Sequence, residues 1–145
     1  MNSNLQRISS IFLYTLPLKA VIPFGYFLFY KFFYLKLIFF ITLPVAIIEN
    51  NLPFGELLLF LILFAGIVRN PKIPYFVRFN GCQALLLDIA LIVLTYLMRI
   101  IPIPEIGSFL FVSILAIFIF CVIQCIRGVE PEIPLISDSA RMQIY

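Results

Sequence analysis

The chain has 145 residues, of which 63% are hydrophobic and only 12% are charged, and its mean hydropathy is +1.14. Soluble domains carry about twice that share of charged residues, and a soluble fold of this length leaves too much surface in water to hide so many apolar side chains. The formal net charge of +3 comes from scattered Lys and Arg residues and gives no indication of a nucleic-acid partner. Membrane lipid is therefore predicted to be the main solvent.

Residues 1–19 are predicted to form an amphipathic helix that lies in the membrane interface. Apolar side chains recur at helical spacing, namely Leu5, Ile8, Ile11, Phe12 and Leu16. Gln6, Arg7 and Ser10 fall away from this stripe, and a one-sided apolar stripe is typical of helices that lie along a membrane surface. Pro17 is expected to end this helix.

Four apolar segments follow, and each is interpreted as a transmembrane helix. They cover residues 26–48, 52–68, 79–98 and 106–126, and a polar tail, 127–145, is expected to be extended. About 20 apolar residues suffice to cross about 30 Å of hydrocarbon. The first helix is expected to begin nearer Phe32, so that Lys31 and Lys36 reach the interface, and to kink at Pro44. Three or five spans are the alternatives, if the first segment is re-entrant or residues 5–22 dip into the membrane.

The positive charges predict the orientation. With four spans, one side holds Arg7, Lys19, Lys31, Lys36, Arg69, Lys72, Arg78, Arg127 and Arg141. The opposite side holds only Arg99, an asymmetry of nine to one. Because Lys and Arg accumulate on the side where a membrane protein is made, both termini are predicted to face that compartment.

No catalytic, cofactor or metal site is predicted. The chain contains no histidine, and Cys82, Cys121 and Cys125 lack the spacing of a zinc site or a disulfide framework. The sequence also has no nucleophile elbow, P-loop or dinucleotide fingerprint. We therefore expect that the protein is not an enzyme.

Asp88 is the one acid near the middle of a predicted span. It shares a narrow stripe of the helix with Gly81, Ala84 and Thr95. A carboxylate at this depth normally faces the interior of a helix bundle or a water-filled cavity, and small residues favour close helix contact. Two interpretations stay open: Asp88 hydrogen-bonds a neighbouring helix, or the stripe lines a hydrated conduit.

The last predicted span carries a second stripe of small and polar residues, which includes Ser113, Ala116 and Gln124. This pattern is typical of helix packing within a bundle. A position facing a pore is the alternative interpretation.

A group of polar and basic residues lies before and at the start of the third span, namely Arg69, Lys72, Arg78, Asn80 and Gln83. Residues in this position usually mark the membrane surface. They are predicted to contact lipid headgroups, loop backbone or a partner protein.

Several short motifs lie in this same central region. They are V-R-N at 68–70, F-V-R-F-N at 76–80, Q-A at 83–84 and L-L-D at 86–88. Leu16-Pro17-Leu18 and Phe24-Gly25 precede them, and I-P-L-I-S at 133–137 follows them. Together, these residues resemble the Tic-twenty family, the twenty-kilodalton multispanning subunit of the protein translocon in the chloroplast inner envelope. Gly81 and Cys82 depart from the residues expected within the central motif.

The resemblance implies a role in moving preproteins across the plastid inner envelope. It implies partners in other translocon subunits, translocating preproteins and membrane lipids, and a four-helix topology with both termini in the stroma. A cyanobacterial owner would place the chain in its plasma membrane. Two alternatives remain open: a small-solute or ion transporter that uses Asp88 as its coupling carboxylate, and an assembly scaffold that conducts nothing.

Overall fold

The computed structural model describes residues 3–101 and 103–144, and within these ranges every regular element is helical. The elements are α1 (Ser3–Leu13), α2 (Thr15–Val21), η1 (Ile22–Gly25), α3 (Tyr26–Lys31), η2 (Phe33–Lys36), α4 (Leu37–Asn51), α5 (Gly55–Leu63), η3 (Phe64–Val68), α6 (Tyr75–Ile100), α7 (Pro104–Arg127) and α8 (Ile136–Gln143). Four segments are long and apolar enough to cross a membrane, namely Ser3–Gly25, Phe33–Asn51, Tyr75–Ile100 and Glu105–Arg127. The predicted class, an all-α membrane protein with four helices of transmembrane length, is confirmed.

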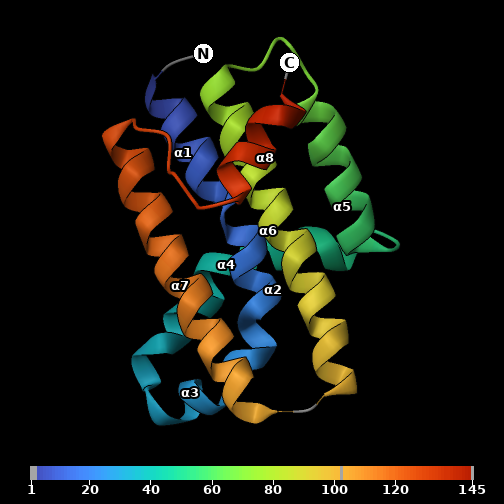
Figure 1. Cartoon of the computed structure of the whole chain (residues 1–145), viewed down its shortest axis with the longest axis vertical. Coiled ribbons are helices and arrows are strands. Elements are labelled where there is room, and N and C mark those ends of the chain that lie inside the picture. Colours follow the sequence, from blue (N-terminus) through green and yellow to red (C-terminus); the bar gives the residue numbers. More distant parts are fainter. Residues whose placement is uncertain (1–2, 102, 145) are drawn as a thin grey trace.

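The helices run mostly along one long axis, whose two ends are easily distinguished in Figure 1. At one end α1 begins, α8 ends and the η3–α6 connection turns; we call this the terminal end. The α6–α7 connection lies at the opposite, distal end. Between them, α1 and α2 pack against both α6 and α7, so the N-terminal helix forms the middle of the bundle.

This central position of the N-terminal helix differs from the interfacial position expected for residues 1–19. Leu13, Tyr14, Leu16 and Leu18 are buried in a helix that packs against α6 and α7, whereas Leu5, Ile8 and Phe12 of the predicted apolar stripe are exposed. The expectation that Pro17 ends the helix is wrong, because Pro17 falls in the first turn of α2. The N–H group that proline lacks would have no partner within the helix at that position.

The two predicted spans at residues 26–48 and 52–68 form more helices, and shorter ones, than the sequence predicted. Phe32 is extended between α3 and α4, and α5 with η3 is shorter than the helices of transmembrane length. Figure 1 shows α4 crossing the bundle obliquely and meeting α5 about halfway along the long axis. From there α5 continues to the terminal end, so α4 and α5 together run along the bundle once. Which residues lie in lipid stays a prediction.

The tight connection between α4 and α5 requires Gly55. Phe54, just before it, adopts a left-handed backbone conformation with φ at 52°, and a Cβ on Gly55 would lie 1.9 Å from the Glu49 carbonyl oxygen. We therefore expect Gly55→Ala to destabilise the protein by about 1–3 kcal/mol, since the overlapping atom belongs to the backbone and cannot rotate away. Thermal unfolding in lipid nanodiscs measures the loss. Gly66→Ala is the matched control, because no atom lies within 4 Å of the added Cβ; equal effects would contradict this role.

The C-terminal tail is not wholly extended, as had been expected. Residues 129–144, which we call the strap, cross the terminal end, and residues 136–143 of the strap form α8 against α6 (Figure 1). Pro131, Ile133, Ala140 and Ile144 of the strap are buried. Leu135 and Met142 are exposed, but Ala140 and Ile144 pack in one apolar cluster with Phe79 and Cys82 of α6, and this burial favours the helix.

Candidate functional site

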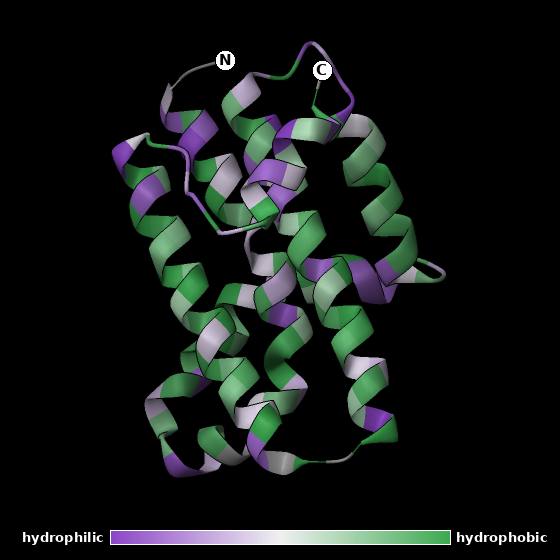
Figure 2. Cartoon of the chain, in the orientation of Figure 1, coloured by the Kyte–Doolittle hydropathy of each residue, from purple (hydrophilic) through white to green (hydrophobic). Residues whose placement is uncertain are grey.

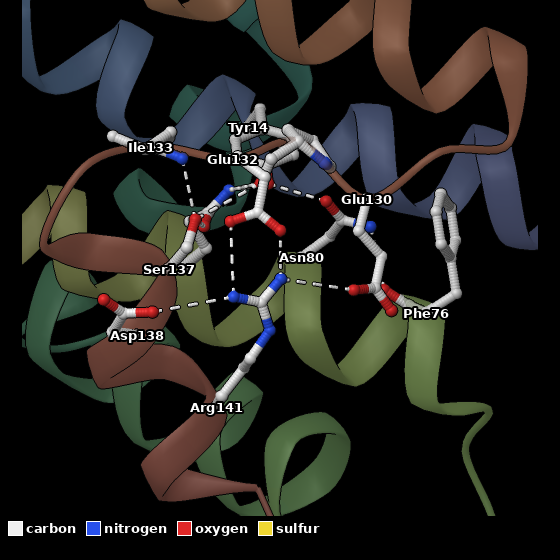
Figure 3. Close-up of polar contacts among 11 residues, drawn as sticks. Tyr14, Phe76, Asn80, Glu130, Glu132, Ile133, Ser137, Asp138 and Arg141 are labelled. Atoms are coloured by element: carbon white, nitrogen blue, oxygen red, sulfur yellow. Dashed lines mark hydrogen bonds and ion pairs between the residues drawn. The ribbon is translucent and has the colours of Figure 1, made fainter.

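A buried polar junction lies toward the terminal end and joins three distant parts of the chain (Figure 3). Tyr14, between α1 and α2, donates a hydrogen bond of 2.6 Å to the amide oxygen of Asn80 on α6. One turn further along α6, the Gln83 amide nitrogen donates to the Tyr14 hydroxyl at 2.9 Å and to the Pro131 carbonyl of the strap at 3.1 Å. The side chains of Asn80 and Gln83 are therefore the centre of the junction.

Ser137 of α8 completes this junction. Its hydroxyl donates to the Gln83 amide oxygen and accepts a hydrogen bond of 2.7 Å from the Ile133 backbone N–H. The Sγ atom of Cys125 on α7 lies 3.7 Å from the Asn80 amide oxygen. Because buried polar groups are costly unless they are paired, this network holds the strap to the bundle.

The structure distinguishes among the contacts predicted for the polar residues near the start of α6. Gln83 bonds loop backbone, at the Pro131 carbonyl, which is one of the predicted contacts. Asn80 and Gln83 are 0% exposed and bonded within the protein, which does not fit a contact with lipid headgroups or a partner. Arg78 is also buried, and its Nε donates to the Val68 carbonyl. Arg69 and Lys72 are exposed in the loop at the terminal end, so only these two of the five remain available for such contacts.

Sequence reasoning missed Tyr14, Pro131 and Ser137 as members of this junction. The one available signal was that short motifs at 16–18, 76–80, 83–84 and 133–137 occurred together. In the structure these motifs, or residues next to them, meet at the junction.

The outer side of the strap is fixed by charged residues (Figure 3). Arg141 forms an ion pair with Glu132 and lies 3.5 Å from a Glu130 oxygen and 3.7 Å from an Asp138 oxygen. Its guanidinium also stacks over the Phe79 ring, 5.0 Å from the centroid. The buried polar network therefore holds the strap to the bundle, while the ionic cluster joins residues of the strap to one another and reaches α6 through the contact of Arg141 with Phe79.

Protonation of Glu132 should loosen the strap. The hydrogen bond from Arg141 lowers the pKa of the Glu132 carboxyl from its ordinary value of 4.5. A lowered folded-state pKa adds stability above the ordinary value and loses it as pH falls through the folded-state pKa. We expect hydrogen exchange in α8, corrected for its intrinsic rate, to accelerate below the ordinary value. In Glu132→Gln exchange should already be faster at neutral pH and depend less on pH; identical profiles would contradict this contribution.

A second polar site lies deeper in the bundle, in a cavity of about 270 Å³. Five charged side chains line it, namely Lys19 of α2, Glu49 of α4, Glu56 of α5, and Asp88 and Arg99 of α6. Lys19 forms an ion pair with Glu49, whose side chain is only 9% exposed, and lies 3.9 Å from Glu56. We call this the charged cavity.

The structure divides the predicted stripe of α6 between packing and the charged cavity. Gly81 and Ala84 are buried, and a Cβ on Gly81 would lie 3.3 Å from Leu13 and 3.4 Å from Ile67. Asp88 and Thr95 line the cavity instead, and the Thr95 hydroxyl donates to the carbonyl of Leu91 within the same helix. Gly81 and Ala84 thus pack within the bundle while Asp88 and Thr95 face the cavity, and the role of the stripe as a hydrated conduit stays a prediction.

The predicted stripe of α7 does not reach the charged cavity. Ser113 donates to the Phe109 carbonyl of its own helix, and Ala116 is exposed. Gln124 is half-buried, and its amide oxygen has no hydrogen-bond partner among the described residues. The structure therefore does not bring these three residues together with Asp88.

The charged cavity continues toward the distal end as an apolar groove. A neighbouring pocket of about 450 Å³ shares Ala20, Pro23, Thr95 and Arg99 with the cavity. That pocket in turn shares Pro23, Phe24 and Met98 with one of about 510 Å³, which reaches the first residues of α7. Toward the terminal end, the buried side chains of the polar junction fill the interior. The hollow part of the bundle is thus on the distal side.

These features define the class of protein: a multi-pass helical membrane protein with a packed polar junction at one end and a charged cavity within it. The family described as "Chloroplast import apparatus Tic20-like" matches residues 4–140. The chain belongs to this family, which confirms the resemblance seen in its motifs.

Curated relatives agree with this assignment. A "Tic20 family protein" of Synechocystis sp. is 33% identical, and the alignment covers 95% of this chain and 92% of the relative. "Protein TIC 20-II, chloroplastic" of Arabidopsis thaliana is 31% identical over 96% of this chain and 72% of its own length. "Protein TIC 20, chloroplastic" of Pisum sativum is 31% identical over 71% of this chain and 44% of its own length. The family thus includes cyanobacterial and chloroplast proteins.

Proposed function

We propose that this chain is a membrane subunit of a protein-import apparatus and that it acts without catalysis. The observation that carries this proposal is the family match over residues 4–140, which includes every helix of the bundle and most of α8. The relatives named as chloroplastic Tic20 proteins support import across a plastid membrane as the process. Its partners are then other membrane subunits, translocating preproteins and the surrounding lipid.

We place the protein in the chloroplast inner envelope with both termini in the stroma, or in the plasma membrane of a cyanobacterium. The charge distribution supports this orientation, although less strongly than predicted. Figure 1 shows α3 near the distal end, so Lys31 and, after it, Lys36 belong with Arg99, while Lys19 lies in the charged cavity. Six basic residues then lie toward the terminal end, namely Arg7, Arg69, Lys72, Arg78, Arg127 and Arg141. Six against three still favours a stromal terminal end.

One copy of this chain does not form a complete passage for a polypeptide. The groove reaches from the distal end to the charged cavity, and beyond it the polar junction is fully packed. A passage must span about 30 Å of hydrocarbon. We infer that the groove contributes one wall, open on the side from which preproteins arrive, and that other subunits complete the conduit.

Site-specific photo-crosslinking to an arrested preprotein tests this function. A photoreactive residue at Asp88 or Thr95 should form adducts with the preprotein, because both side chains line the cavity. Phe109, which is exposed on the outer side of α7, is the control and should not. Adducts with membrane subunits alone would favour a scaffold. Unchanged import after depletion of the protein would contradict the proposed function itself.

A further inference from the structure

The connection between α4 and α5 carries an unusual group of exposed polar residues. We call residues 49–56 the polar turn. Asn50 and Asn51 are exposed, the Glu56 side chain is 73% exposed, and Phe54 is 87% exposed. The turn therefore presents carboxylate and amide groups, together with non-helical backbone, on the outside of the bundle.

The surfaces on either side of the polar turn are apolar. Toward the terminal end, Leu57, Leu61 and Ile62 of α5 are exposed. Toward the distal end, α6 exposes Val93 and Leu97, and Figure 2 shows the hydrophilic band at the turn between hydrophobic stretches of helix. If lipid covers both stretches, as their apolar surfaces predict, the polar turn lies at the depth of the hydrocarbon.

Lipid hydrocarbon cannot form hydrogen bonds with the exposed polar groups of this turn. Irregular backbone at membrane depth is tolerated where protein covers it or water fills a cavity beside it, and carboxylates at this depth normally face protein or a hydrated space. Glu49 faces the charged cavity and binds Lys19, but Glu56 and the two asparagines also face outward. Glu56 also lines the charged cavity, but its strong exposure, together with that of the two asparagines, favours a protein neighbour over lipid on the outward side of the turn.

The charges around the turn indicate whether the neighbouring protein presents an acidic or a basic side chain to it. The cavity and the turn hold three carboxylates, those of Glu49, Glu56 and Asp88, against the two basic groups of Lys19 and Arg99. Lys19 is bound to Glu49 and only 3.9 Å from Glu56. The group therefore has one more carboxylate than basic groups, and Glu56 is strongly exposed.

We propose that the polar turn is an interface for a transmembrane helix of a different subunit, which presents a lysine or arginine side chain to Glu56. This rests on the proposed function in one respect, that the chain works within a membrane complex. A second copy is disfavoured, because a two-fold interface would set Glu56 against Glu56. A translocating preprotein is disfavoured too, because it would leave the turn uncovered whenever import stops.

Photo-crosslinking from Phe54 in native membranes without any arrested preprotein tests the interface. The expected result is an adduct with another membrane protein, mapped by mass spectrometry to within about one turn of a Lys or Arg in a transmembrane helix. Phe109 of α7 is the control, since it is also strongly exposed but lies outside the polar turn. It should crosslink to lipid.

The variant Glu56→Lys should reduce the Phe54 adduct by about tenfold or more, because like charges facing each other oppose association. Glu56→Gln should keep most of it. Adducts with lipid alone, with a second copy of this chain, or with a preprotein alone would each overturn the proposal, as would labelling of Phe54→Cys by a membrane-impermeant maleimide. Failure of the import function would show instead as normal import after depletion, with the Phe54 adduct still formed.

Discussion

Replacing Lys19 with leucine should lower the stability of the protein by about 3–5 kcal/mol. Lys19 supplies the ammonium that pairs with Glu49, and the Glu49 side chain is almost completely buried. Removal of one partner of a buried ion pair leaves the other charge without compensation, which costs far more than the intact pair contributes. Unfolding in lipid nanodiscs by a graded denaturing detergent measures the loss.

The double variant Lys19→Leu with Glu49→Leu separates this explanation from simple loss of packing. It should recover most of the lost stability, because no unpaired charge remains and apolar replacements of buried pairs are often neutral or stabilising. Lys72→Leu, at an exposed loop position, should change little. If the double variant were as unstable as Lys19→Leu, the ion pair would not be the cause.

The variant Gln83→Leu should destabilise the protein by about 3 kcal/mol and release the strap. Leucine fills a similar volume, but it leaves the Tyr14 hydroxyl, the Pro131 carbonyl and the Ser137 hydroxyl each without one partner. Buried polar groups that lose their partners cost about 1–3 kcal/mol each, partly offset by relaxation. The loss is measured by the same unfolding assay, and release of the strap by protease cleavage within residues 129–144.

Two further variants make this test specific. Gln143→Leu removes an exposed glutamine at the end of α8 and should leave stability unchanged. Ser137→Ala should cost less than Gln83→Leu, because it removes one member of the network rather than its centre. Equal cleavage of the strap in Gln83→Leu and Gln143→Leu would show that the junction does not hold it.

The sequence predicted the all-helical class and the long helices well, for a clear physical reason. α6 and α7 contain the predicted ranges 79–98 and 106–126 and extend slightly beyond them. Both ranges are predominantly apolar over about 20 residues, and the prolines between them separate one helix from the next. Hydrophobicity alone therefore determined where these elements lie.

The same reasoning could not place the α4–α5 region. Glu49, Asn50 and Asn51 read as a surface turn, because a polar cluster between apolar segments normally lies at the membrane boundary. In the structure, Lys19 from the N-terminal helix binds Glu49 and holds the connection about halfway along the bundle. That partner is 30 residues away in the chain, and hydropathy carries no information about it.

The candidate sites also include residues whose position the sequence predicted and residues whose position it did not. Asp88 was identified because an acid in the centre of an apolar run is unusual, and it does line a cavity. Asn80 and Gln83 looked like surface residues because they lie near the start of a helix. Their hydrogen bonds with Tyr14 and Ser137 show that these two side chains lie in the interior. The local order of polar and apolar residues does not predict pairing between residues so far apart in the chain.

The polar junction also constrains the order in which the protein can be made. Its hydrogen bonds join residues 66 positions apart, Tyr14 and Asn80, and 54 positions apart, Gln83 and Ser137. A ribosome makes these segments in sequence, so Asn80 and Gln83 are synthesised before Ser137 is available to bond them. Until then these amides must be accommodated by water, lipid headgroups or an insertion factor. The bundle therefore completes its folding only after translation of its last helix, and a nascent chain interrupted before that point presents unmatched amides to membrane quality control.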